Sequence, residues 1–178
     1  PLLTVELEER DAENCRFFEK QGHQKLARFT DFELKGKLEQ PELTELISEI
    51  NIGDLEDRYL IGEEGEELDV DEVLPWIRQA ETLRNRMEEM RGFGIPDLDG
   101  IAAYVFARDA SEENKRFVDV CALGCRDGEK TPLYMSILLR YVSQTFEKGV
   151  RIPRLSEREI PYEIVEDLGF EKRRGYFL

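Results

Sequence analysis

The run from Gly100 to Leu178 constrains the fold most, because apolar segments of strand and helix length follow one another along it in a fixed order. The segments Ile101–Arg108 and Arg116–Leu123 predict two antiparallel strands, joined by the polar connection 109–115. A loop with two glycines comes next, and a long apolar helix follows the loop. This order predicts a sheet with a helix packed on one face.

The long helix is placed by residues at both of its ends. Thr131 predicts the N-cap, Pro132 the first helical position, and Gly149 the end. Apolar residues at helical spacing form a broad face, of the kind that usually packs on a sheet. They are Leu133, Ile137, Leu138, Tyr141, Val142 and Phe146.

The last part of the chain predicts a strand at 150–155, a helix near 157–168 and a final strand at 170–178. Gly169 predicts the end of that helix, and Pro161 is expected near its start. Together with the preceding elements, these predict alternation of strands and helices around one sheet.

The N-terminal part predicts fewer elements. Alternation over Leu3–Glu8 predicts a strand, and Asp11 predicts the N-cap of a helix over 12–21 that stops at Gly22. Apolar residues at helical spacing predict a second helix over 41–50.

An acidic helix is predicted over 73–91, and the glycine- and proline-containing segment 92–96 is expected to end it. No linker rich in Pro, Gly and Ser divides the chain. We therefore expect one domain over 1–178, with an acidic helical insertion at about 63–95.

The charge of the chain limits its partners. Asp and Glu number 40 against 25 Lys and Arg, and the net charge is −15. Nucleic-acid binding is not expected, because it depends on neutralising phosphates with basic side chains. An acidic surface favours partners that carry amines or are basic. Imitation of nucleic acid by this surface is a more distant alternative.

Three cysteines, an odd number, favour a reduced intracellular setting. The sequence shows neither a signal pattern nor an apolar run long enough to span a bilayer, so we expect a soluble, cytoplasmic protein without membrane contact. No metal site is expected, because His23 is the only histidine and Cys121 and Cys125 lack the spacing of a ligand pair. The oligomeric state cannot be inferred from these features.

The loop before the long helix is a candidate anion site. Helix N-termini expose backbone donors, Gly124 and Gly128 allow close approach, and Arg126 and Lys130 supply positive charge. Two acidic neighbours repel an anion unless they point away, and Asp127 is one of them. A tight solvated turn remains the alternative interpretation.

From Gly100 to Leu178 the chain resembles the GNAT superfamily of acetyltransferases, and Leu168-Gly169-Phe170 is the clearest shared motif. The resemblance implies an α+β fold with a central, mostly antiparallel sheet flanked by helices. It also implies that acetyl-coenzyme A is the cosubstrate.

The resemblance implies that the donor contacts the strand end and the loop. Of the three positions of the family's phosphate loop, here Cys125, Gly128 and Lys130, the glycine alone is retained. Where many members place a catalytic tyrosine this chain has Val165, and Tyr162 lies three residues earlier. The expected donor-binding residues are Leu123, Cys125, Arg126, Gly128, Lys130 and Thr131.

Asp119 is the candidate general base, and Tyr162 is the candidate general acid. Asp119 stands between Val118 and Val120 in an otherwise apolar strand, where burial favours proton uptake by a carboxylate. The alternative is a solvent-facing position at a sheet edge. Cys121 and Cys125 are expected to be small apolar fillers rather than nucleophiles.

Two functions follow from these features. The first is transfer of an acetyl group from acetyl-coenzyme A to an amine of a small molecule or a basic protein. The second is a GNAT-shaped module that has lost catalysis and acts through protein–protein contacts, which the altered loop and Val165 favour. Whether the chain is an enzyme stays open at this stage.

Overall fold

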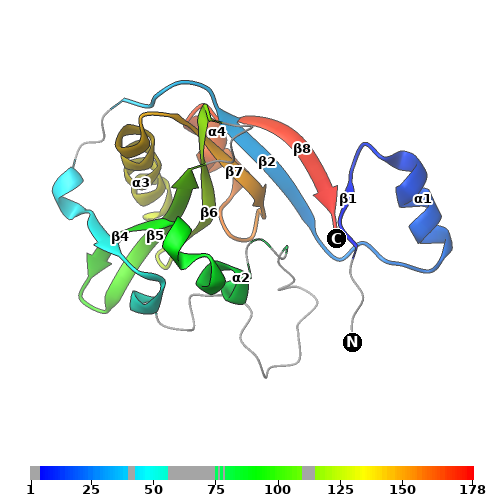
Figure 1. Cartoon of the computed structure of the whole chain (residues 1–178), viewed down its shortest axis with the longest axis horizontal. Helices are drawn as coiled ribbons and strands as arrows, with labels where there is room; N and C mark the ends of the chain where they lie inside the picture. Colours follow the sequence, from blue (N-terminus) through cyan, green and yellow to red (C-terminus); the bar gives the residue numbers. More distant parts are fainter. Residues whose placement is uncertain (1–4, 40–42, 56–74, 76, 78, 110–114) are drawn as a thin grey trace.

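The computed structural model describes residues 5–39, 43–55, 75, 77, 79–109 and 115–178. Its strands form one sheet and are β1 (Leu7–Glu8), β2 (Arg28–Leu34), β3 (Ser48–Ile50), β4 (Arg91–Asp97), β5 (Gly100–Asp109), β6 (Phe117–Cys125), β7 (Gly149–Leu155) and β8 (Glu171–Phe177). Their order across the sheet is β1-β8-β2-β7-β6-β5-β4-β3 (Figure 1). Neighbours are antiparallel except β6 and β7, which confirms the predicted mixed fold with a mostly antiparallel sheet.

Helices lie on both faces of this sheet (Figure 1). The longest is α3 (Thr131–Phe146), and α4 (Tyr162–Asp167) packs with it in the same apolar core. On the other face, α2 (Ala80–Asn85) contributes Leu83 to a second apolar cluster. The layers follow from strand alternation, because successive side chains of a strand point to opposite faces.

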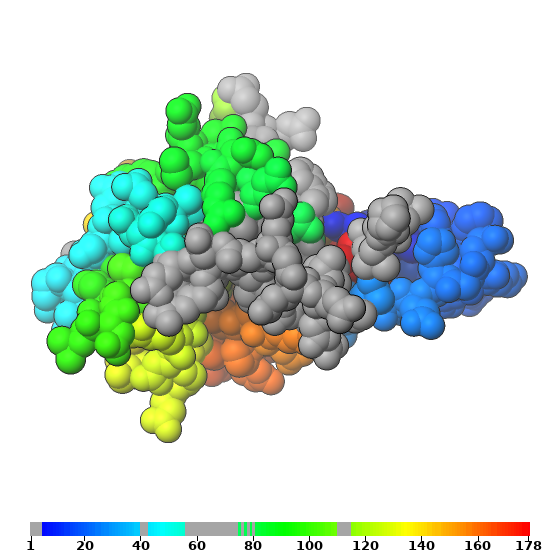
Figure 2. Space-filling view, turned by 90° about the horizontal axis from the view of Figure 1, so that it is seen from below, coloured from blue at the N-terminus to red at the C-terminus, as the bar shows by residue number. Residues whose placement is uncertain are grey.

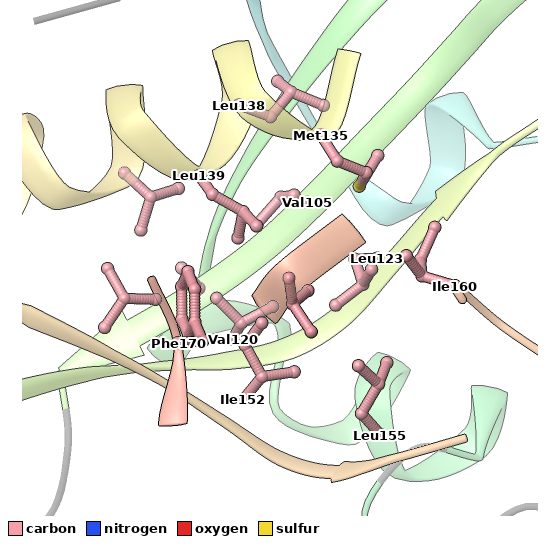
Figure 3. Packing of buried hydrophobic residues seen from close by; sticks show 14 of the residues in the cluster. Val105, Val120, Leu123, Met135, Leu138, Leu139, Ile152, Leu155, Ile160 and Phe170 are labelled. Carbon is pink, nitrogen blue, oxygen red and sulfur yellow. The ribbon is translucent and has the colours of Figure 1, made fainter. Parts of the chain in front are cut away.

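The main core lies between the sheet and α3, as the broad apolar face of this helix predicts. Figure 3 shows α3 side chains directed at residues of β5, β6 and β7. Several of the contributing side chains are completely buried, so their removal from water is a major stabilising contribution. They include Val105, Val118, Val120, Met135, Leu138, Leu139, Val142, Val150 and Ile152.

The second cluster lies on the opposite face of β5 and β6. Phe106 and Ala122 alternate with residues of the main core and contact Ile50, Ile52 and Leu83. Because both faces of β5 and β6 are covered, these strands read as nearly continuous apolar runs in the sequence.

The helix α1 (Ala12–Lys20) lies at one end of the long axis of the molecule (Figures 1 and 2). It begins where the sequence predicted, because the Asp11 carboxylate accepts a hydrogen bond from the Asn14 N–H at 3.2 Å. Gly22, after the helix, has the left-handed φ of 89°. Cys15 is the buried residue of this helix.

Two of the helix predictions are wrong. The first segment is not an α-helix, and the second contains a much shorter helix than predicted. Over 41–50 the described residues form a 3₁₀ turn, Thr44–Leu46, and then β3, because pairing with β4 outweighs a weak helical pattern. Over 73–91 the described helix is α2 alone, followed by the 3₁₀ turn Met87–Glu89. The first part of the predicted acidic insertion, 63–74, lies outside the described residues.

The segment predicted to end the acidic helix is the strand β4. Its glycines are required by close packing rather than by a turn. A Cβ on Gly92 would lie 2.4 Å from the Ile50 carbonyl oxygen and 2.5 Å from the Phe106 ring. The glycine therefore lets β3 and the Phe106 ring approach the strand, a role that glycine can have inside sheets.

The strand β2 was not predicted, and it lies between β7 and β8 in the sheet. Its pairing with both neighbours shifts register between Thr30 and Phe32. At this irregularity Arg154 has a left-handed φ of 55°, and its N–H donates to the Asp31 carboxylate at 2.9 Å. The Arg154 guanidinium binds the same carboxylate at 2.8 Å, so Asp31 compensates the strained backbone with two kinds of hydrogen bond.

The ends of α3 differ in detail from the prediction. Its N-cap is Lys130 rather than Thr131, and its C-cap is Glu147, which takes a left-handed φ of 54° before Gly149. The helix α4 begins only at Tyr162, after Pro161, so it is shorter than predicted. Gly169 ends it with a φ of 89°, as predicted.

Candidate functional site

The parallel strands β6 and β7 separate after a short paired region. Their pairing covers Phe117–Asp119 and Gly149–Arg151, whereas β6 continues to Cys125 and β7 to Leu155. Figure 3 shows the two ribbons diverging from Val120 and Ile152 toward Leu123 and Leu155. We call the region between residues 120–125 and 152–155 the fork. Along it, the β6 edge that faces β7 has no ladder partner among the described residues.

A β-bulge in β6 lies at the start of the fork. Phe106 of β5 pairs with Ala122, and Ala107 pairs with Val120, so Cys121 is the extra residue. The bulge shifts the alternation of the strand by one residue. Leu123 consequently faces the main core, where it is 3% exposed. Its side chain is packed, so a ligand in the fork can meet only its backbone.

An ion pair closes the narrow end of the fork. Arg151 donates from Nε to Asp119 Oδ1 at 2.7 Å and from Nη2 to Oδ2 at 2.9 Å. The hydrogen bonds to the Asp119 carboxylate raise the pKa of the Arg151 guanidinium above its ordinary value. Asp119 is buried in the middle of the sheet, so its predicted alternative, a solvent-facing edge position, is wrong. Both of its carboxylate oxygens already accept hydrogen bonds.

The loop at the wide end of the fork is held by its own side chains. Arg126 pairs with the Asp97 carboxylate and donates to the Asp99 carbonyl oxygen at 3.2 Å. The hydrogen bond from Arg126 lowers the pKa of Asp97 below its ordinary value of 3.8. The Cys125 thiol donates to the Asp127 carbonyl oxygen at 3.3 Å. These contacts join the loop to the β4–β5 turn.

Asp127 closes the turn before α3, and Thr131 does not cap the helix as the sequence predicted. Its Oδ1 accepts the N–H groups of Glu129 at 3.0 Å and Lys130 at 3.3 Å. Thr131 instead donates its hydroxyl to the Asp127 carbonyl oxygen at 2.9 Å. The assignment of Thr131 fails because the helix starts after an aspartate turn that begins earlier in the chain. An inward-pointing Asp127 was the unfavourable case for anion binding.

Lys130 and Gly128 complete the loop. The Lys130 ammonium lies 3.1 Å from Asp127 Oδ2, and this contact raises the pKa of Lys130 and lowers that of Asp127. Gly128 is exposed, and a Cβ built on it would meet nothing within 4 Å. A ligand can therefore approach the loop at Gly128, but the two cations of the loop, Arg126 and Lys130, are already paired with carboxylates.

Tyr162 begins α4 and is buried against the fork. Its hydroxyl donates to the Leu155 carbonyl oxygen at 3.1 Å, and its ring meets Phe32 edge-on at 5.1 Å. Burial raises the pKa of Tyr162 above its ordinary value of 10.0, so its hydroxyl is protonated at neutral pH. Val165, one helical turn later, is completely buried in the main core.

Asp119 and Tyr162 approach the sheet from opposite faces. Val118 and Val120 both belong to the main core, so Asp119 between them points to the other face. Tyr162 belongs to the main core itself. The fork is the place where the two faces meet, since the sheet has no hydrogen-bonded ladder there. A group bound in the fork would therefore have a base on one side and an acid on the other. Group transfer can use this arrangement, because one side chain removes a proton while the other supplies one.

The sequence analysis missed the roles of Arg151 and Asp127. Arg151 stood out as a charge in the apolar strand 150–155, as Asp119 did in its own strand. Their pairing requires the register of two parallel strands, which a crossover separates in the sequence. For Asp127 the signal was the turn chemistry of an aspartate three residues before a helix N-cap.

In the part of the chain that the structure describes, no three His, Cys, Asp or Glu side chains are grouped so that they could hold a metal ion. Among the same residues, no helix is both long enough and apolar enough to cross a membrane.

Similar architectures occur among solved structures. A GCN5-related N-acetyltransferase from Sphaerobacter thermophilus superposes with a TM-score of 0.59 at 12% identity, covering 97% of this chain and 56% of that one. A second, from Kribbella flavida, gives 0.56 at 13% identity, covering 97% and 65%. A protein described as a GNAT-family acetyltransferase from Novosphingobium aromaticivorans gives 0.56 at 14% identity, covering 85% and 63%.

The chain has the GNAT fold. No model of a protein family matches the sequence, and no curated protein does. The chain covers 56%, 65% and 63% of the lengths of these three solved proteins, in the order given above. The fold predicted from Gly100–Leu178 is thus confirmed at the level of architecture.

Acetyl-coenzyme A is the cosubstrate that the GNAT fold implies. The residues of this chain fit the pantetheine arm of that molecule better than its pyrophosphate. The open β6 edge fits the amide-bearing pantetheine arm, because an extended amide chain can pair with unpaired strand backbone. The loop fits the pyrophosphate less well, because the Asp127 carboxylate accepts the N–H groups of Glu129 and Lys130. The fork is therefore the stronger part of the candidate site.

Proposed function

We propose that this chain is an acyltransferase that accepts an acetyl group from acetyl-coenzyme A and transfers it to an amine. The observation that carries the proposal is the fork between the parallel strands β6 and β7, followed directly by the loop and α3. The GNAT fold of the chain supports it. When bound, acetyl-coenzyme A would supply an activated acetyl thioester.

The β6 backbone at the fork binds and orients the donor. Beyond Asp119 the β6 edge that faces β7 forms no ladder with another strand of the described residues, so an extended amide chain can pair with it there. The bulge at Cys121 bends β6, so the backbone N–H and C=O groups after it point in a different direction from those in the paired part of the strand. The buried side chains of Leu123 and Leu155 exclude water on the α3 side.

Asp119 and Tyr162 handle the protons of the transfer. A bond forms between the amine nitrogen and the acetyl carbon, and the carbon–sulfur bond breaks. Asp119, directly or through a water, takes the proton that the amine loses, and Tyr162 gives a proton to the departing thiolate. Arg151 is a positioning residue, because it holds both oxygens of Asp119. Each oxygen of Asp119 keeps a second lone pair, so the carboxylate can take a proton while Arg151 stays bound.

We infer that the acceptor is a cationic amine, carried by a small molecule or by a basic protein. The net charge of −15 supports this choice, because an acidic surface concentrates cations and guides them toward it. The amine must lose its own charge before it attacks. It loses this first proton to bulk water, which leaves Asp119 to take the second proton during the transfer.

The proposal is tested by calorimetric titration of the purified chain with acetyl-coenzyme A, with its melting temperature followed in parallel. Saturable binding and a rise in melting temperature are expected. Absence of saturable binding at high micromolar donor would contradict the proposal.

The role of Asp119 is tested by Asp119→Asn. We expect turnover of an amine acceptor to fall about a hundredfold while donor binding is retained. Asp167→Asn, an exposed change on α4 with the same chemistry, is the matched control and should leave turnover unchanged. Equal turnover in the two variants would remove Asp119 from the mechanism.

A binding module without catalysis is the second candidate. Two observations favour it: Val165 fills the main core where many GNAT members have a tyrosine, and Asp127 occupies the donors of the loop. Donor binding without turnover of any amine would support this candidate over the enzyme.

A further inference from the structure

The turn that leads into α3 already holds an anionic group, and the group belongs to the chain itself. The Asp127 carboxylate accepts the N–H groups of Glu129 and Lys130 at 3.0 and 3.3 Å. It also lies 3.1 Å from the Lys130 ammonium. Backbone N–H groups at a helix start and a nearby cation are the partners that phosphates use in other proteins.

The second cation of the loop is also engaged. Arg126 pairs with the Asp97 carboxylate and donates to the Asp99 carbonyl oxygen, so its guanidinium is directed at the β4–β5 turn. Asp127 is ionised at neutral pH, because its contact with Lys130 lowers its pKa below the ordinary value of 3.8. An incoming phosphate therefore meets a carboxylate at the Glu129 N–H and the Lys130 ammonium, whereas the Lys130 N–H also donates to the Asp127 carbonyl oxygen at 3.1 Å.

The Asp127 side chain can leave this place without moving the core. It is 38% exposed, and the neighbouring Gly128 is open to solvent. A phosphate can thus replace it, but only after its hydrogen bonds and its contact with Lys130 are broken. A ligand that binds only the form with Asp127 displaced has its affinity reduced by the fraction of molecules in that form.

We propose that the Asp127 carboxylate competes with the donor pyrophosphate for the start of α3 and so sets the affinity for acetyl-coenzyme A. This inference rests on the proposed function and assigns an affinity-determining residue to the same site. The donor is held mainly by its pantetheine arm in the fork. Its nucleotide half contributes less to the binding affinity than it would if the loop N–H groups did not bind Asp127.

The test compares two donors and two variants by calorimetry. Asp127→Asn keeps a side-chain oxygen that can accept the loop N–H groups but removes the negative charge. We expect it to bind acetyl-coenzyme A about tenfold more tightly than the wild type. Binding of S-acetylpantetheine, which has no phosphate, should change less than about twofold.

Glu129→Gln is the matched control, because it makes the same change of charge in the same loop on an exposed side chain. Its affinity for acetyl-coenzyme A should stay within about twofold of the wild type, since an exposed carboxylate is screened by solvent and the loop N–H groups donate to Asp127 rather than to the Glu129 side chain. Equal gains in both variants would assign the effect to net charge and overturn the inference. Asp127→Ser, which also forms turns of this kind, replaces Asp127→Asn if that variant does not fold.

The outcomes separate the inference from the proposed function. If S-acetylpantetheine binds the wild type but Asp127→Asn leaves the affinity for acetyl-coenzyme A unchanged or lower, the inference is wrong and the proposed function stands. If neither donor binds the wild type or any variant, the proposed function is wrong, and the inference fails with it.

Discussion

Asp119 and Asp127 are both aspartates in or beside β6, and their surroundings give them different roles. Asp119 is buried and bound at both oxygens by Arg151, which fixes it at the narrow end of the fork. Asp127 is partly exposed and closes the turn before α3 with one carboxylate oxygen. The first is restrained by a buried partner, whereas the second can exchange its partners with a ligand. Residue type alone does not distinguish these cases.

At the same scale, Tyr162 predicts a dependence of stability on pH. Its pKa is raised in the folded chain by burial, so the protonated form is favoured there. Its contribution to stability is complete below pH 10.0, the ordinary pKa, and is lost as the pH rises through the higher folded value. The free energy of unfolding of the wild type should therefore decrease above about pH 10.

The Tyr162→Phe variant tests this dependence by urea denaturation across pH 8 to 11. The variant should be less stable by about 1 kcal/mol at pH 8, because the hydrogen bond to Leu155 is lost. Its stability should also decline less steeply above pH 10. Tyr134→Phe is the control, and identical alkaline slopes in wild type and Tyr162→Phe would contradict the assignment.

At the scale of elements, the junction of β6 and β7 determines where the fork opens. The two strands are joined by a short parallel ladder and by the pair Asp119–Arg151. Parallel strands need a crossover, here through the loop and α3, so this contact forms only when the surrounding units have assembled. The strand proposed to bind the donor, β6, is thus also one of the two strands that this junction holds together.

Removal of Arg151 should destabilise this junction. In Arg151→Met the Asp119 carboxylate, whose side chain is 6% exposed, is left without its charged partner. We expect a loss of about 2–4 kcal/mol in the free energy of unfolding, measured with urea. The double variant Asp119→Leu with Arg151→Met should recover most of it, because neither charge is then buried alone.

Arg174→Met is the matched control for this loss. Arg174 is 61% exposed and lies 3.8 Å from Glu8, so its replacement should have little effect. A similar small effect in Arg151→Met would show that the ion pair does not hold the strands together.

At the scale of the whole molecule, the net charge of −15 is the dominant property. Many basic side chains are already paired with acidic ones, as in Arg108–Glu89 and Lys148–Asp109. The excess of negative charge remains and repels itself in the folded chain. Salt screens repulsion between exposed charges within a Debye length of about 8–10 Å.

The melting temperature should therefore rise with salt. Between 20 and 200 mM NaCl we expect an increase of about 2–5 °C, followed by circular dichroism. The same series in KCl should give the same result if screening is the cause. A melting temperature that falls with salt would mean that the ion pairs contribute more than the net repulsion.

The sequence by itself determined the C-terminal half of the sheet, because its strands and α3 carry strong apolar patterns and glycine stops. The antiparallel pair β5–β6, the strand β7, and the end of α4 at Gly169 all follow from local patterns. The candidate Asp119 was named from its position in such a pattern, whereas Tyr162 was named from the resemblance to the GNAT family. Local periodicity suffices where an element packs one face on a large core.

The tertiary structure decided the rest, for reasons of register and long-range pairing. The strand β2 was missed because its partners β7 and β8 are distant in the sequence, and β4 was missed because Gly92 serves close packing rather than a turn. The pairing of Asp119 with Arg151 depends on the register of parallel strands, and the role of Asp127 depends on the turn that carries it. Composition and spacing name the groups that can react, whereas the partners that bind or free them are set only when distant segments meet.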